Sequence, residues 1–271
     1  MKVAAKSTDG LVQRDRLVIV LAVISGVTDA IGFLHLGGAF ASVMTGNMVL
    51  LGVSIATGDA TLTIRTVAAV LAFIAGCGIG ARVAGQAADG DPPWPREVSR
   101  ALALELALFT LSATIWISRH GELRGAAATG LLSLAAAALG VQSAAIQRFG
   151  VRALSTTYFT GTLTTTVVEL AQTGGVTGSV RNLKLLAGLI GGAIGGALLA
   201  SHTTAAAPLI QVVTLIAVLL LAPRAEGSTR AAPASIATGH PDRQRPPRPG
   251  AKPEQAVNPG LDARTTGTPQ A

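Results

Sequence analysis

The sequence has few charged residues, few aromatic residues and a single cysteine. Only 13% of its 271 residues are charged, about half the share in an ordinary soluble domain. Aromatic residues make up 3%, although aromatic side chains usually dominate a soluble core. One cysteine, Cys77, allows no disulfide within the chain. These shortages exclude a disulfide scaffold and argue against a soluble enzyme, and the 49% hydrophobic content excludes a disordered protein.

The chain is instead rich in small and aliphatic residues, and its mean hydropathy is +0.53. Small residues let helices approach closely in lipid. The chain contains apolar stretches of about 20 residues, the length that spans a bilayer. They predict an all-α polytopic membrane protein with about six transmembrane helices. Two further segments, Ser42–Thr57 and Ser155–Gln172, are shorter or richer in Thr, Asn and Gly. The six predicted spans are Leu17–Leu36, Ile64–Ala87, Ala101–Ile117, Gly125–Ile146, Leu183–Ala200 and Ala205–Ala222.

Basic residues give the chain a net charge of +7 and flank its apolar body. This placement is typical of topology signals in membrane proteins, and no basic stripe interleaved with aromatics predicts nucleic-acid binding. The first span exceeds the apolar run of a signal peptide, so we expect it to be retained. We predict a basic cytoplasmic N-terminus over residues 1–16 and a disordered, Pro- and Arg-rich cytoplasmic tail over residues 223–271. The segment Asp89–Arg100 is predicted to be a loop.

The two halves of the apolar body resemble each other. Thr45-Gly46-Asn47-Met48 aligns with Thr160-Gly161-Thr162-Leu163, and Arg65-Thr66 aligns with Arg181-Asn182. Small residues also align, with Gly76 and Gly80 matching Gly192 and Gly196. An ordered series at nearly constant spacing predicts a duplication, with repeats over residues 17–118 and 125–222.

Repeat symmetry leaves two topologies open. Eight spans would make the halves parallel, whereas six spans with two broken segments would make them inverted. With six spans, Arg65, Arg119 and Arg124 are the only basic residues expected outside, so the positive-inside rule favours the inverted arrangement. Short, Gly-interrupted segments at corresponding places in two halves point to a transporter binding site.

Three carboxylates fall within or at the edge of apolar segments. Asp29 lies well inside the first span, where a charge is costly and usually functional. It could couple protons or bind solute, or it could form a structural pair with Arg65 or Arg148. Glu169 could be interfacial. For Glu105, one turn into its span, we expect the side chain to reach the interface.

The Thr-Gly segments combine hydroxyl groups, an amide and glycine. Such residues can unwind a helix and expose its backbone to a ligand, or they can hydrogen-bond across helices. Hydroxyl side chains in Ser155-Thr156-Thr157 strengthen the first interpretation. The sequence has no Cys/His spacing for zinc, no phosphate-binding loop and no nucleophile elbow. We therefore expect neither an enzyme nor a cofactor or metal.

Several of these residues also carry a family resemblance. The stretches from Gly26 to Phe40, from Met44 to Gly52 and from Ser155 to Thr164, with Gly140-Val141-Gln142-Ser143-Ala144, resemble the YoaK-like family of bacterial inner-membrane proteins, built on a domain of unknown function. The resemblance covers about residues 15–222 and implies a polytopic membrane protein. Family members usually have Asn after this Gln, where the present chain has Ser143.

The sequence thus predicts a small secondary transporter or permease of an unknown small solute in the bacterial inner membrane. We expect the lipid bilayer to surround the protein, and a second copy of the chain, in a homo-oligomer, is a further candidate partner. The alternative is a non-transporting scaffold or lipid-handling protein, and an intramembrane enzyme is the third reading. The predicted substrate-binding or coupling residues at the repeat interface are Asp29, Thr45, Gly46, Asn47, Gln142, Thr160, Gly161, Thr162 and Glu169.

Overall fold

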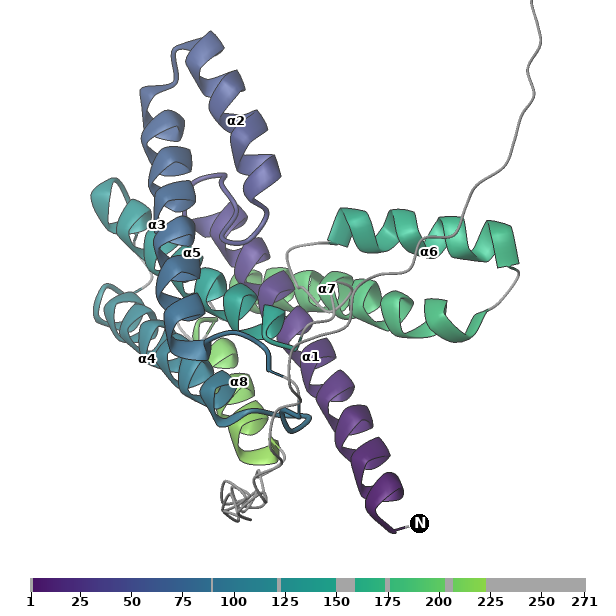
Figure 1. The fold of residues 1–271 in the computed structure, drawn as a ribbon. Coiled ribbons are helices and arrows are strands. Elements are labelled where there is room, and N and C mark those ends of the chain that lie inside the picture. Colours follow the sequence, from purple (N-terminus) through teal and green to yellow (C-terminus); the bar gives the residue numbers. More distant parts are fainter. Residues whose placement is uncertain are drawn as a thin grey trace, which may run out of the picture. The chain divides into compact units, whose positions relative to one another are not determined.

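Eight α-helices and no strand make up the part of the chain that the structure, a computed structural model, describes (Figure 1). It describes residues 2–88, 90–120, 123–149, 159–173, 176–202 and 207–222, all within one compact unit, Met1–Ser228. The second unit, Thr229–Ala271, and the predicted tail 223–271 lie outside these residues. The helices are α1 Lys2–His35, α2 Met44–Thr57, α3 Ala60–Ala84, α4 Arg96–Ser118, α5 Ala126–Gln147, α6 Phe159–Thr173, α7 Val176–His202 and α8 Leu209–Leu221.

Five of these helices are long and apolar enough to cross a membrane, which confirms a polytopic, all-helical protein. They correspond to the first five predicted spans. The sixth, Ala205–Ala222, is shorter than predicted, because α8 has 13 residues and Pro208 precedes its first turn. At 1.5 Å per residue α8 extends about 20 Å, less than the roughly 30 Å of a hydrocarbon core. The spans are Asp9–His35, Ala60–Ala84, Arg96–Ser118, Ala126–Gln147 and Val180–His202.

Local capping residues set the bounds of α2, α3 and α4. Gly58 ends α2 with φ +73°, a left-handed conformation that suits glycine. The side chain of Asp59 then accepts a hydrogen bond from the Leu62 amide and starts α3 one turn earlier than predicted. Pro95 precedes the first turn of α4, so the predicted loop Asp89–Arg100 ends before Arg96.

Two helices, α1 and α5, lie at the centre of the packing. Two-thirds of the apolar window of each (67%) is buried, compared with 22% in α3 and in the described span of α7. The most extensive helix pairs are α1 with α7 and α3 with α5. Outer faces carry large exposed hydrophobic side chains, including Ile64, Leu71 and Ile74 on α3 and Ile190 and Ile194 on α7. In a membrane such faces contact lipid tails.

Glycines make both extensive pairs possible. In the α1–α7 pair, a Cβ on Gly26 would overlap the Leu189 carbonyl, and one on Gly192 would overlap the Val23 carbonyl. Each helix backbone therefore rests directly on the other, as small residues allow in membranes.

The α3–α5 pair has the same arrangement. A Cβ on Gly140 of α5 would overlap the Phe73 carbonyl of α3, and one on Gly76 of α3 would overlap the Ala137 carbonyl of α5. The two pairs thus use one packing solution, in which a glycine from each helix faces a carbonyl of its partner.

Candidate functional site

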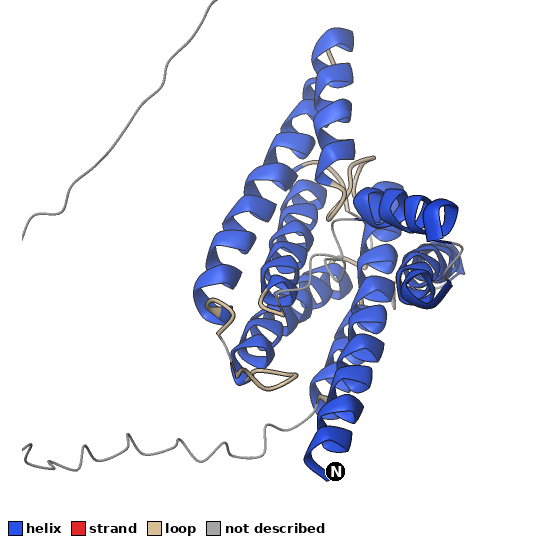
Figure 2. Cartoon of the chain, turned by 45° about the vertical axis from the view of Figure 1, so that its right-hand side comes forward, coloured by secondary structure: helices blue, strands red, loops and turns tan. Residues whose placement is uncertain are grey.

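The chain breaks helical structure directly after α1, in a segment that is largely buried. Gly37 and Gly38 have φ values of +104° and +81°, which only glycine adopts readily. Leu36, Ala39 and Ala41 in this break are each at most 3% exposed. Figure 1 and Figure 2 show α2 leaving the break in the same general direction as α1, with α3 returning. Non-helical backbone that is buried must find its hydrogen bonds within the protein.

Asp29 accepts several hydrogen bonds of the break from within α1. Its Oδ1 accepts hydrogen bonds from the backbone amides of Ala41 at 2.8 Å and Ser42 at 2.7 Å. Its Oδ2 accepts one from the Ser42 hydroxyl at 2.5 Å. The side chain is 6% exposed. The carboxylate therefore anchors the break, and the suggested pairing with Arg65 or Arg148 is wrong, because three donors of the loop occupy its oxygens.

Asn47, in the first turn of α2, holds the other side of the break. Its Nδ2 donates to the Phe40 carbonyl at 2.7 Å, and its Oδ1 accepts from the Phe40 amide at 2.9 Å. Gly46 lies close to the Phe40 ring: a Cβ added to Gly46 would be 3.3 Å from the nearest ring atom. The Thr45 side chain is exposed. The Met-Thr-Gly-Asn motif therefore closes the loop that Asp29 begins.

Arg65 lies over the same break from α3. Its guanidinium group covers Gly37, where it would collide with any Cβ, and its Nη1 donates to the Gly37 carbonyl at 3.4 Å. We name the set Asp29, Ser42, Asn47 and Arg65 the loop anchor. Three helices, α1, α2 and α3, contribute to it.

A buried polar seam continues from α1 to α5 and α8. Gln142 of α5 is fully buried, and its Nε2 donates to the Ser25 hydroxyl at 3.0 Å and to the Leu21 carbonyl at 3.4 Å. Gln211 of α8 reaches the Thr28 hydroxyl at 3.5 Å. Thr28 is adjacent to Asp29 in α1, so the seam adjoins the loop anchor. We name Ser25, Thr28, Gln142 and Gln211 the polar seam.

The second Thr-Gly segment lies on α6, which packs on α7. Thr160 is exposed, Gly161 and Glu169 are half-buried, and Thr162 is buried. Among the described helices, α2 and α6 do not form a packed pair, so the structure does not bring the two Thr-Gly motifs together. The predicted hydroxyl cluster Ser155-Thr156-Thr157 lies outside the described residues.

Glu105 contradicts the expectation that its side chain reaches the interface. Glu105 is 0% exposed and lies on the face of α4 that packs against other helices. The reason is its register: it shares a helix face with the buried residues Leu102 and Phe109, three and four positions away.

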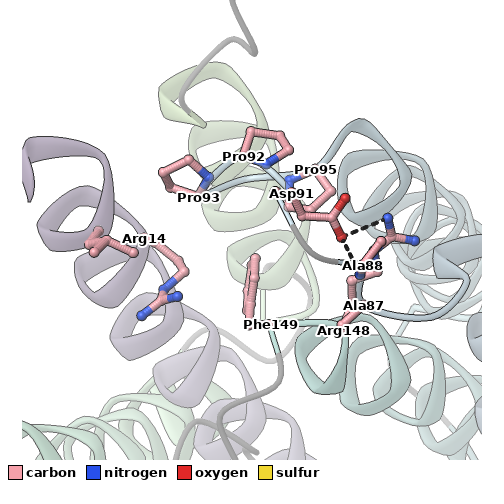
Figure 3. A pocket seen from close by; sticks show the side chains of 11 residues that line it. Arg14, Ala87, Ala88, Asp91, Pro92, Pro93, Pro95, Arg148 and Phe149 are labelled. Atoms are coloured by element: carbon pink, nitrogen blue, oxygen red, sulfur yellow. Dashed lines mark hydrogen bonds and ion pairs between the residues drawn. The ribbon is translucent and has the colours of Figure 1, made fainter. Parts of the chain in front are cut away.

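A cleft of about 310 Å³ lies at the other end of α1, distant in sequence from the loop anchor (Figure 3). The Nη2 of Arg148 contacts Asp91 Oδ2 at 3.0 Å, and Nη1 binds the Ala84 carbonyl. The guanidinium of Arg14 lies 5.5 Å from the centre of the Phe149 ring. Both arginines have carboxylate neighbours, Asp15 and Asp91, so their charges are largely compensated. This cleft joins α1, the α3–α4 loop and the end of α5.

No group of three or more potential metal ligands occurs among the described residues. The polar side chains of the loop anchor and the polar seam are hydroxyls, amides, one carboxylate and one guanidinium group. Such groups can bind a polar solute or a proton, or can fix helices to one another.

The chain matches, over residues 17–221, the family described as "Protein of unknown function (DUF1275)". It belongs to this family. It is also 31% identical, over 158 residues, to the "UPF0700 transmembrane protein YoaK" of Bacillus subtilis (strain 168). That match covers 58% of this chain and 68% of the relative. No solved structure matches the chain. The DUF1275 match covers all five long apolar helices except the first residues of α1, and it confirms the predicted resemblance.

Sequence reasoning missed several members of the two clusters. Ser25, Thr28, Ser42 and Gln211 were not singled out, although each is a polar residue within or beside an apolar segment. Ser25 and Thr28 both bond to the carbonyl four residues earlier in α1, at 3.2 and 2.7 Å. This bonding hides their polarity locally, and only neighbouring helices give them a further role.

Proposed function

We propose that this protein is a small secondary transporter or permease for a polar solute, built from two inverted repeats in the bacterial inner membrane. The observation that carries the proposal is the buried break between α1 and α2. Its backbone is held by Asp29, Asn47 and Arg65 rather than by helical hydrogen bonds. Broken helices at membrane depth are the usual means by which transporters offer backbone groups to a solute.

Reciprocal glycine packing supports the duplication. The helices of the α1–α7 pair occupy the same places in their halves as those of the α5–α3 pair. Gly192 faces Val23 as Gly76 faces Ala137, and Gly196 faces Val27 as Gly80 faces Val141. Each pair joins one helix from each half, so the halves exchange partners across a common interface.

The directions of the helices support inversion. Because α2 continues the course of α1, α3 is the first helix to return (Figure 1). Helices α4 and α5 then reverse in turn, so α5 runs opposite to α1. Arg14, Arg148 and Arg181 also gather at one end, where Arg181 contacts Asp15 at 3.7 Å. By the positive-inside rule this end, with the N-terminal part of α1 and the end of α8, faces the cytoplasm.

In this proposal the solute site lies where the loop anchor meets the polar seam. Amide and hydroxyl groups come from Asn47, Gln142 and Thr28. Asp29 fixes the loop whose backbone groups also contact the solute. Thr45, Thr160, Gly161, Thr162 and Glu169 join the path when α2 and α6 move relative to the central helices. No bond-making chemistry is proposed, and the protein is not an enzyme in this account.

A non-transporting scaffold or lipid-handling protein is the second candidate. One observation favours it: the oxygens of Asp29 and the amide of Asn47 are already bonded to the loop. Polar groups that are so well satisfied can serve as interhelical fixings alone. The two candidates differ in whether the break binds anything.

A binding screen separates them. The melting temperature of the full chain in lipid nanodiscs is measured in the presence of each member of a panel of amino acids, sugars, nucleosides and inorganic ions. Solutes that raise the melting temperature are then tested for uptake into proteoliposomes. A transporter gains stability as the concentration of its solute exceeds Kd. Asn47→Gln should lose that shift, whereas Asn182→Gln, on α7 outside both clusters, should keep it. A screen without any shift or uptake would favour the scaffold.

A further inference from the structure

Glu105 is a fully buried carboxyl group that the proposed solute site does not use. It is 0% exposed. Neither of its carboxyl oxygens has a hydrogen-bond partner among the described residues. Asp29 differs in this respect, since three donors hold its oxygens. Among the described residues, Asp29 is thus a buried carboxyl held by donors, and Glu105 is a buried carboxyl without one.

The helices packed against α4 offer Glu105 no counter-charge. They are α5, α8 and α3. Helices α5 and α8 contain no charged residue. Helix α3 contributes Arg65 and Arg82, near its two ends, and Cys77; each arginine donates to a backbone carbonyl, of Gly37 and Gly78 respectively.

The remaining charged or titratable groups near α4 lie toward its ends. No ion pair between Glu105 and any of them occurs in the described part of the chain. An ionised carboxylate without a donor or a cation is very costly in an apolar interior, whereas the uncharged acid is not. The groups near the ends of α4 are Arg96, Glu97 and Arg100 in its first two turns, Arg148, which lies 3.8 Å from Glu97, Arg119 and His120 directly after α4, and His35, whose ring lies 6.2 Å from that of Trp116.

We propose that Glu105 is the proton-carrying group of the transport cycle. Its carboxylate binds a proton, which this occluded conformation holds as the O–H of the acid, and it releases that proton when α4 moves its face to water. The inference rests on the proposed function and adds to it the coupling ion, H⁺.

A small cavity lies on the α4 face that carries Glu105. It holds about 20 Å³, enough for one water molecule. Thr28, Ser112 and Gln211 are among its lining residues. Phe109 and Ser112, also in its lining, follow Glu105 by four and seven residues on α4, so all three lie on one helix face. Glu105 does not itself line the cavity, so α4 must move to bring its carboxyl group to the polar groups of the seam.

Infrared spectroscopy of the full chain in lipid nanodiscs tests the proposal. The C=O stretch of a protonated carboxyl in an apolar site is followed as pH is varied reversibly. We expect a band that disappears at high pH and is absent from Glu105→Gln at every pH. Glu97→Gln, on the same helix beside Arg148 at 3.8 Å, should keep the band. A band unaffected by Glu105→Gln, or a Glu105 band that never titrates, would overturn the proposal.

Carbodiimide labelling gives a measurement that needs no variant. The carboxyl O–H of a buried acid adds across a C=N bond of dicyclohexylcarbodiimide, and the adduct rearranges to a stable N-acylurea without a leaving group. Peptide mass mapping should locate the label on Glu105, with labelling slower as pH rises. Label only on other carboxyls, or none, contradicts proton access to Glu105.

The two proposals fail separately. If solute uptake is found and Glu105 does not titrate, transport stands and the coupling group is elsewhere. If Glu105 titrates and no solute in the panel is bound or carried, the transporter proposal fails, and with it the role of this proton in a transport cycle.

Discussion

The side chain of Asn47 forms hydrogen bonds with both backbone groups of Phe40, accepting from its amide at 2.9 Å and donating to its carbonyl at 2.7 Å. In this arrangement the side-chain amide makes the same two hydrogen bonds that the backbone of a neighbouring β-strand would make. It satisfies a backbone that no helix can satisfy, inside a protein that sits in lipid. An amide suits this position, since only Asn and Gln present an N–H donor and a C=O acceptor side by side on one planar group.

The first prediction concerns Asn47. Asn47→Asp keeps the acceptor and removes the donor, so the Phe40 carbonyl loses its partner and faces a second oxygen. We expect the free energy of unfolding to fall by about 1–3 kcal/mol. Denaturant or thermal unfolding in detergent measures it. Thr45→Val is the control, because the Thr45 side chain is exposed; equal losses in both variants would contradict the role of Asn47.

The second prediction concerns Asp29. Asp29→Ala leaves the buried amides of Ala41 and Ser42 without an acceptor, and each such amide costs about 1–3 kcal/mol. Asp29→Asn keeps one oxygen for both amides and should be much milder. The comparison variant is Asp59→Ala, which removes an exposed helix cap worth about 0.5–2 kcal/mol. Were Asp29→Ala no worse than Asp59→Ala, the loop anchor would not depend on this carboxylate.

The third prediction uses two neighbouring glycines of α7. Gly192→Ala forces a methyl group onto the Val23 carbonyl, whereas the space beside Gly191 is open. Gly192→Ala should lower the free energy of unfolding by about 1–3 kcal/mol, and Gly191→Ala should leave it almost unchanged.

The equivalent glycine of the first half, Gly76 on α3, provides an independent check, with Gly130 on α5 as its control. Gly76→Ala meets the Ala137 carbonyl, and Gly130 has open space. A duplicated packing interface predicts that Gly76→Ala and Gly192→Ala lower the melting temperature by similar amounts, with Gly130→Ala as the control. A large difference between the two halves would argue that the interfaces are not equivalent.

The fourth prediction concerns the cleft at the end of α5. Arg148→Ala removes a charged hydrogen bond to the Ala84 carbonyl and should cost about 1.5–3 kcal/mol. Asp91→Ala removes a partly exposed ion pair, worth at most about 1 kcal/mol, and the hydrogen bond that Asp91 Oδ2 accepts from the Ala88 amide at 3.0 Å. Raising the salt concentration should weaken the effect of Asp91→Ala by a larger fraction than that of Arg148→Ala, because salt screens the ion pair more than the backbone hydrogen bonds. Melting curves at low and high salt measure both.

Asp29 and Glu105 show where reasoning from sequence succeeds and where it stops. A carboxylate inside an apolar span is conspicuous in a sequence because its cost in lipid is high, so both residues could be found. Which one is held by donors and which is left free depends on the loop after α1 and on the neighbours of α4. Those contacts join residues that are 12 or more positions apart, and periodicity carries no information about them.

The sequence alone determined that this chain is a helical membrane protein, because apolar runs of bilayer length and scarce charge leave no other stable arrangement in water or lipid. It also ended the first span at Leu36 and began the next segment at Ser42, and these bounds bracket the break between α1 and α2. Only the tertiary structure decided that α1 pairs with α7 and α3 with α5, and that Asp29 bonds to Ala41 and Ser42. Helix pairing depends on how surfaces fit across distant parts of the chain, and a glycine reveals close approach only when the carbonyl it faces is known.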